Sequence, residues 1–124
     1  MVPKFRCWDE RLGLTEVVSI DFFRKKIKIN HWEYGDSNFF PLDEVVLMQS
    51  TGLKDKNGVE IYCGDAVEWL GHRGIVEFVL NNQQTMLIGA SGYITDLDYS
   101  TDFNTEVIGN IYENPKILGQ ANES

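Results

Sequence analysis

The sequence predicts a mainly β protein made of short antiparallel strands, folded as a small barrel or sandwich. Three observations favour this class. Apolar residues recur with a period of two, extended runs follow one another at roughly ten-residue spacing, and Gly, Asn and Ser turn signals separate them. The chain of 124 residues is long enough for one domain, or for two small lobes that share a core.

The first clear strand is predicted around residues 24–30, RKKIKIN. Strand alternation divides this segment into two faces, with Phe23, Lys25, Ile27 and Ile29 on one and Arg24, Lys26 and Lys28 on the other. The next apolar run, residues 41–50, begins with Pro41 and acidic residues, which suits a helix start as well as a turn. We predict a short turn that runs into a strand.

Further strands are predicted at GIVEFVL (74–80), TMLIGA (85–90) and EVIGNIY (106–112). In the first of these, alternation places Val76, Phe78 and Leu80 on one face and Ile75, Glu77 and Val79 on the other. The intervening GHRG, NNQQ and SG segments predict hairpin turns.

Residues 52–69, GLKDKNGVEIYCGDAVEW, read as a turn, a strand, a second turn and the start of another strand. Asn57 and Gly58 tolerate the positive φ angles of a two-residue type I′ hairpin turn. Gly64 is expected to adopt a left-handed conformation, and the Asp65 carboxylate to accept a nearby backbone N–H. A role for Asp65 as a general base or metal ligand is the disfavoured alternative, because no other acid or histidine lies at ligand spacing.

Three separated motifs carry a family resemblance: KFRCWD (4–9), LMQSTGLKDKNGVEIYCGDAV (47–67) and EVIGNIYENP (106–115). Through them the chain resembles the YopX family of small phage and prophage proteins, although Cys63 and Ala66 depart from the usual pattern. The resemblance implies a mostly β protein whose C-terminal part is similar to an SH3-type barrel. It also implies a phage origin and a bacterial cytoplasmic setting, but no activity and no catalytic residues.

A subdomain boundary is predicted near residues 50–52, where Ser-Thr-Gly follows an apolar run and the charge balance shifts. We expect residues 1–51 to form an N-terminal β subdomain, packed on an SH3-like barrel of residues 52–124. Both parts are too short for us to expect independent folding.

The net charge of the chain limits the kinds of partner that it can be expected to bind. Eleven basic and 19 acidic residues give a formal net charge of −8, and residues 51–124 carry −7 of it. Such an acidic chain repels phosphate, which disfavours broad nonspecific binding to nucleic acid. The alternative is that the acidic residues only keep the protein soluble and have no role in binding.

No apolar run approaches the roughly 18 residues of a membrane-spanning helix, and charges interrupt the N-terminal segment where a signal peptide would be apolar. A soluble cytoplasmic protein with reduced cysteines is therefore expected, and the family resemblance implies that the cell is bacterial. The metal-type residues Cys7, His31, Cys63 and His72 match no common zinc spacing, so we expect neither a metal nor a cofactor.

Two candidate recognition surfaces emerge. The first is a patch at a GHRG hairpin tip, made of Trp69, His72, Arg73 and Tyr93. The second is a basic face of Arg24, Lys25, Lys26 and Lys28, with Phe22 and Trp32 nearby. The alternatives are an ordinary polar hairpin tip for the first surface and protective lysines on an edge strand for the second.

The lack of clustered catalytic residues, the uneven charge and the family resemblance together favour a non-enzymatic prophage accessory protein. It would act as a homo-oligomeric binding or assembly module with an unknown phage or host partner. The basic face of one copy would pair with the acidic C-terminal half of the next, in a head-to-tail ring if the geometry closes. The alternative is a nucleic-acid-associated protein of phage replication or expression that binds through the basic face. An enzyme with a site near Asp65, His72 and Tyr93 is disfavoured, because no base, nucleophile and oxyanion donor can be placed together.

Overall fold

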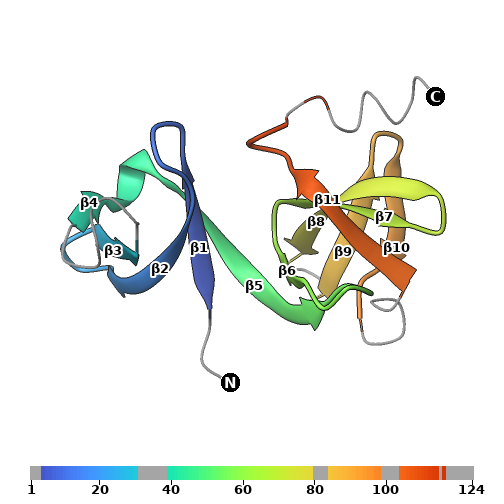
Figure 1. Cartoon of the computed structure of the whole chain (residues 1–124), viewed down its shortest axis with the longest axis horizontal. Coiled ribbons are helices and arrows are strands. Elements are labelled where there is room, and N and C mark those ends of the chain that lie inside the picture. Colours follow the sequence, from blue (N-terminus) through green and yellow to red (C-terminus); the bar gives the residue numbers. More distant parts are fainter. Residues whose placement is uncertain (1–3, 31–38, 80–83, 99–103, 115, 117–124) are drawn as a thin grey trace. The chain divides into compact units, whose positions relative to one another are not determined.

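A computed structural model describes residues 4–30, 39–79, 84–98, 104–114 and 116. These residues form antiparallel strands and one short 3₁₀ helix, η1 (Leu42–Glu44), so the mainly β prediction is confirmed (Figure 1). The chain divides into two compact units, Met1–Gln49 and Ser50–Ser124. None of the helical segments in the described part of the chain could span a bilayer.

The first unit is a sheet in the order β4-β3-β2-β1, with the first part of β5 beside β1. Its strands are β1 (Phe5–Asp9), β2 (Gly13–Asp21), β3 (Lys26–Asn30), β4 (Phe39–Pro41) and β5 (Val46–Lys54). The 3₁₀ helix leads directly into β5, which confirms the predicted turn running into a strand.

The core of the first unit forms around Cys7, Ile27 and Ile29, all fully buried. Ile27 and Ile29 alternate with Lys26 and Lys28 along β3, so the period-two pattern holds within the strand. The same alternation does not extend back to Phe23. Because β3 begins only at Lys26, Phe23 lies in the preceding loop with 95% of its surface exposed, and its predicted place on the strand face of Ile27 and Ile29 is wrong.

The second unit begins with residues 50–54 of β5, which pair with β6. Its own strands are β6 (Glu60–Tyr62), β7 (Asp65–Trp69), β8 (His72–Val79), β9 (Gln84–Gly89), β10 (Gly92–Asp96) and β11 (Thr105–Asn110). Five of them form a sheet in the order β10-β9-β8-β7-β11. Among the described residues no ladder joins the outer strands β10 and β11, so the sheet is open by its strand pairing.

Both faces of β8 carry buried apolar side chains. Val76 belongs to the main core of the unit, whose buried members are Leu53, Ile61, Val67, Val76, Leu87 and Leu97. Ile75 instead packs with Ala66 in a separate cluster. Phe78 lies two residues after Val76 and so on the same face of the strand, but it is 50% exposed. The buried part of that face therefore ends before Phe78.

Candidate functional site

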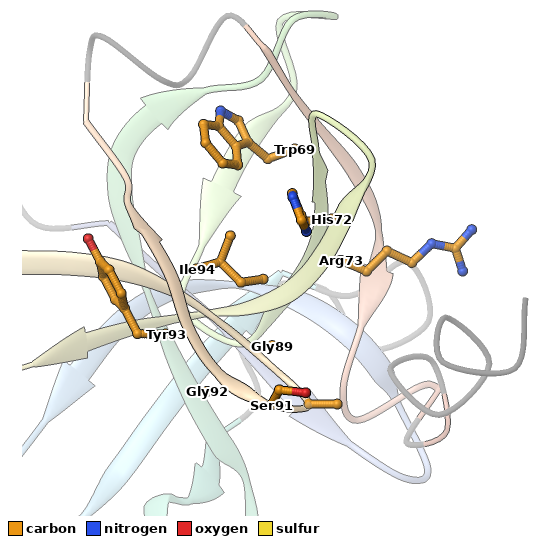
Figure 2. A pocket seen from close by; sticks show the side chains of 9 residues that line it. Trp69, His72, Arg73, Gly89, Ser91, Gly92, Tyr93 and Ile94 are labelled. Carbon is orange, nitrogen blue, oxygen red and sulfur yellow. The ribbon is translucent and has the colours of Figure 1, made fainter.

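An open pocket of about 380 Å³ lies in the Ser50–Ser124 unit, between two hairpins (Figure 2). The β7–β8 hairpin contributes Trp69, His72 and Arg73, and the β9–β10 hairpin contributes residues 89–94. We call this the aromatic pocket. It brings together the four residues of the first predicted patch, although Tyr93 is 20 or more positions from the others in the sequence.

The turn between β7 and β8 sets the positions of Trp69 and His72. Leu70 and Gly71 form a two-residue turn with φ angles of 48° and 85°, the positive pair of a type I′ turn. Leu70 and Gly71 are therefore the hairpin tip, and the prediction that His72 and Arg73 lie there is wrong: both belong to β8. Because this turn contains only two residues, His72 and Arg73 are the first two residues of β8. There they line the pocket together with the β9–β10 hairpin.

Trp69 and His72 are directly opposite each other across the β7–β8 ladder. Their ring centroids are 6.2 Å apart with an interplanar angle of 29°, a stacked arrangement. The Trp69 side chain also packs against the main core of the unit, which holds the indole in place. The pair therefore offers a pre-positioned aromatic surface to the pocket.

Charged and polar groups flank this surface on two sides. The Arg73 Nε donates to Glu68 Oε2 at 3.3 Å, and the Tyr93 hydroxyl donates to Asp96 Oδ1 at 3.1 Å. Partial desolvation and the Asp96 hydrogen bond raise the pKa of the Tyr93 phenol above its usual value of 10.0. Figure 2 shows the Arg73 guanidinium and the Tyr93 ring extending to opposite sides, with Ile94 between them.

The β9–β10 hairpin shapes the base of the pocket through Gly89. A Cβ atom at Gly89 would lie 2.8 Å from Ile94 Cδ1 and 3.2 Å from the Arg73 carbonyl oxygen. Ile94 therefore occupies the space that a side chain at position 89 would need. The sequence did not indicate Gly89 or Ile94 as pocket residues. A glycine within a strand indicates that another part of the chain approaches closely, but not which part.

The residues of the predicted basic face do not share one strand face. Lys26 and Lys28 lie on β3, whereas Arg24 and Lys25 lie in the β2–β3 loop, where Lys25 has a φ of 56°. The strand β3 runs between β2 and β4, so the expectation of an edge strand is also wrong. Lys28 lies with its Nζ 5.8 Å from the Phe39 ring centroid, a cation–π contact, and Trp32 is outside the described residues.

The turn at residues 55–58 differs from the predicted type I′ form. Gly58 has a φ of 81°, but among the described non-glycine residues only Lys25 and Leu70 have positive φ, so Asn57 does not. The Gly58 N–H donates to the Asp55 carbonyl at 3.0 Å, and the Asp55 carboxylate accepts the N–H of Asn57 at 2.9 Å. The Asp-x-Asn-Gly pattern was the available signal for this turn.

At the second predicted turn, Gly64 has a φ of 97° and the buried Asp65 carboxylate accepts the backbone N–H of Tyr62 at 2.8 Å. Asp65 is 1% exposed and is not among the residues that line the aromatic pocket. The structure thus places His72 and Tyr93 together without Asp65. Within the described part of the chain, no three His, Cys, Asp or Glu side chains are arranged to hold a metal ion.

Comparison with known proteins identifies a family and a similar solved structure. Residues 4–119 match the family model described as YopX protein. The fold is similar to the crystal structure of protein EF1440 from Enterococcus faecalis, with a TM-score of 0.62 and 26% sequence identity over 95% of this chain and 99% of that chain. No curated protein matches the chain.

Proposed function

The chain belongs to the YopX family, and from that membership we propose that it is a prophage-encoded, non-enzymatic binding and assembly module of the bacterial cytoplasm. The observation that supports this proposal is the aromatic pocket. It presents the stacked Trp69 and His72 rings and the exposed Tyr93 ring to solvent, on two neighbouring hairpins. Exposed aromatic side chains beside a hollow are typical of recognition surfaces.

The chemistry of the pocket favours binding over catalysis. Its guanidinium is engaged by Glu68 and its phenol by Asp96. Figure 2 shows Ser91 well away from His72, so the lining hydroxyl is not placed beside the imidazole as a nucleophile would be beside its base. What remains is a set of ring faces near carboxylates, which suits an apolar, aromatic or cationic side chain of a partner.

In this proposal residues 52–124 form an SH3-type barrel and residues 1–51 a separate β subdomain. Two contacts support the barrel. The Lys56 N–H donates to the Thr105 carbonyl at 3.0 Å, and the Val107 N–H donates to Asp55 Oδ2 at 2.9 Å. They attach the β5–β6 turn to β11, whose ladder partner is β7, so β11 has neighbours on both sides.

Affinity capture from prophage-induced bacterial cells tests the function. The tagged wild-type protein is compared with His72→Ala and Tyr93→Ala, and with Tyr112→Ala as a control at a tyrosine that does not line the pocket. We expect the wild type and the control to retain the same phage or host macromolecule, and the two pocket variants to lose it. Equal retention by all four proteins would refute a binding role for the pocket.

A second candidate function is association with nucleic acid in phage replication or expression. The observation that favours it is the β2–β3 loop, where exposed Phe22 and Phe23 precede Arg24, Lys25 and Lys26. Aromatic side chains next to basic ones can stack on bases while the cations contact phosphates. This candidate predicts binding to single strands that depends on these residues and on Lys28, and that weakens steeply with salt. Absence of binding at low salt would exclude it.

A further inference from the structure

We propose that the β2–β3 loop of one copy of this chain inserts Phe23 into the aromatic pocket of a second copy. We call residues 21–26, DFFRKK, the aromatic tip. This inference rests on the proposed function, since it names the occupant of the same pocket. It makes the module a head-to-tail assembly in which every copy offers one tip and one pocket.

The aromatic tip exposes more apolar surface than a hairpin loop normally does. Phe23 is 95% exposed and Phe22 is 68% exposed, and the two are adjacent. Phe22 also lines a shallow hollow of about 300 Å³ in its own unit, together with Val17 and Ile20, whereas Phe23 does not. Adjacent exposed aromatic rings at a loop mark a docking surface, and Phe23 is the ring that is free to enter a partner.

The charge of the aromatic tip is opposite to that of the unit that holds the pocket. Arg24, Lys25 and Lys26 are all exposed and outnumber the single acid, Asp21, to which Arg24 is bonded. The sequence of the pocket-bearing unit, in contrast, carries 11 acidic and four basic residues. This complementarity favours a second copy over a nucleic acid, whose phosphates the acidic unit repels.

The pocket has the size and chemistry to receive Phe23. A volume of about 380 Å³ lies at the lower end of the range of about 300–1,000 Å³ found for binding sites, which suits one or two side chains. The Trp69 and His72 rings supply aromatic faces for the Phe23 ring. The carboxylates of Glu68 and Asp96 are hydrogen-bonded to two lining residues of the pocket, and their charge favours a basic tip over an acidic one.

The pairing is heterologous, because the tip and the pocket are different surfaces. Repetition of such a contact gives a ring if the rotation closes and a filament if it does not. A contact made by one loop is small compared with a permanent interface, so a single contact is weak and reversible. Self-association should therefore depend on protein concentration and weaken as salt is added.

Sedimentation velocity of purified full-length chains tests this inference with two variants. The tip variant is Phe23→Ser, and the pocket variant is Tyr93→Ala combined with Ser91→Lys, which adds a cation where the basic tip would dock. All three positions are exposed in the folded chain, so we expect unfolding temperatures close to that of the wild type. Matched controls are Phe39→Ser and Tyr112→Ala, which remove exposed rings elsewhere in each unit.

We expect the wild type and both controls to self-associate at micromolar concentration, and each variant alone to associate about tenfold or more weakly. An equimolar mixture of the two variants should form a one-to-one dimer and nothing larger. The reason is that the tip variant keeps an intact pocket and the pocket variant keeps an intact tip. A symmetric tip-to-tip contact would leave the pocket variant fully associated and would overturn the inference.

Three further results would overturn it: a strictly monomeric wild type, variants that associate as the wild type does, or a mixture that does not pair.

Phe23-dependent binding of a single-stranded oligonucleotide by a monomeric wild type would instead assign the tip to nucleic acid. A monomeric protein whose captured partner is still lost in Tyr93→Ala would refute the inference and leave the proposed function standing. Self-association through tip and pocket without any captured partner would support the inference while refuting recognition of a different macromolecule.

Discussion

The Asp55 carboxylate, in the turn between β5 and β6, accepts the backbone N–H of Val107 on β11, 52 positions later, at 2.9 Å. The other oxygen of the same carboxylate accepts the N–H groups of Asn57 and Val59, each at 2.9 Å. Asp55 is 5% exposed, so all three donors depend on it rather than on water. One side chain thus closes a local turn and attaches that turn to the last strand.

Replacing Asp55 with alanine should lower the free energy of unfolding by about 3 kcal/mol or more, because three backbone donors lose their acceptor. The measurement is chemical denaturation of the Asp55→Ala protein. Glu113→Ala, at an exposed carboxylate of the same unit, is the control and should change little. A loss below about 1 kcal/mol would mean that water replaces the carboxylate.

The Asp9 carboxylate makes stability depend on pH. The Arg11 side chain donates to both of its oxygens at 3.1 Å, and this bonding holds the pKa of Asp9 below its ordinary value of 3.8. A carboxylate with a lowered folded-state pKa stabilises the protein above its unfolded pKa, and this contribution is lost as pH falls through the folded-state pKa. Asp9→Asn should therefore cost about 2 kcal/mol near pH 7.

The same substitution should cost less in acid, at a pH below the folded-state pKa of Asp9, where the wild-type carboxyl group is also protonated. Denaturation curves at the two pH values measure this difference. Glu10→Gln, at the exposed neighbouring carboxylate, is the control. If the loss of stability caused by Asp9→Asn stays the same at both pH values, the charge of Asp9 does not stabilise the turn between β1 and β2.

Leu70 is a site where a substitution should stabilise the protein. Its φ of 48° is unfavourable for a leucine, and its side chain is 63% exposed, so little packing is lost on replacement. Leu70→Asn creates the Asn-Gly pair that type I′ turns prefer and should add about 0.5–1 kcal/mol. Thermal unfolding measures the gain, and Val59→Asn, at an exposed position without positive φ, should show none.

Gly89→Ala should reshape the aromatic pocket as well as destabilise the chain. The new Cβ would displace Ile94 and press on the Arg73 carbonyl, at a cost of about 1–2 kcal/mol. Gly74→Ala is the matched comparison, because its Cβ would clash with Leu87 and the Ile88 carbonyl, outside the pocket lining. The Trp69 indole N–H signal in an NMR spectrum should move in Gly89→Ala and stay nearer its wild-type position in Gly74→Ala.

Burial raises the pKa of both thiols, Cys7 and Cys63, above the ordinary value of 9.0. A smaller thiolate fraction at neutral pH means slow alkylation of the folded protein, rising with pH. Cys7 is fully buried and Cys63 only partly, so Cys63 should react first. Mass spectrometry after an iodoacetamide pulse measures this order, and rapid labelling of Cys7 in the folded state would contradict it.

Local pattern was sufficient for several strands, among them β3, β8, β9 and β11, and for the positions of some turns, but it did not indicate β1, β2 or β4. Alternation placed Ile27 and Ile29 on one strand face, which is buried in the structure, and the Asn-Gly and Gly-Asp pairs marked where the chain turns, because these signals depend on neighbouring residues alone. The three separated motifs were sufficient for the family. The same pattern misplaced Phe23, since alternation cannot say at which residue a strand begins.

Only the tertiary structure decided which side chains meet. Tyr93 and Ile94 reach Trp69 and His72 because β8 pairs with β9, and Asp55 reaches Val107 because the β5–β6 turn lies against β11. Such pairings join segments that are far apart in the chain, and their register depends on the hydrogen bonds and core packing of the whole sheet. The exposure of Phe23 was decided in the same way, by where β3 starts its ladder with β2.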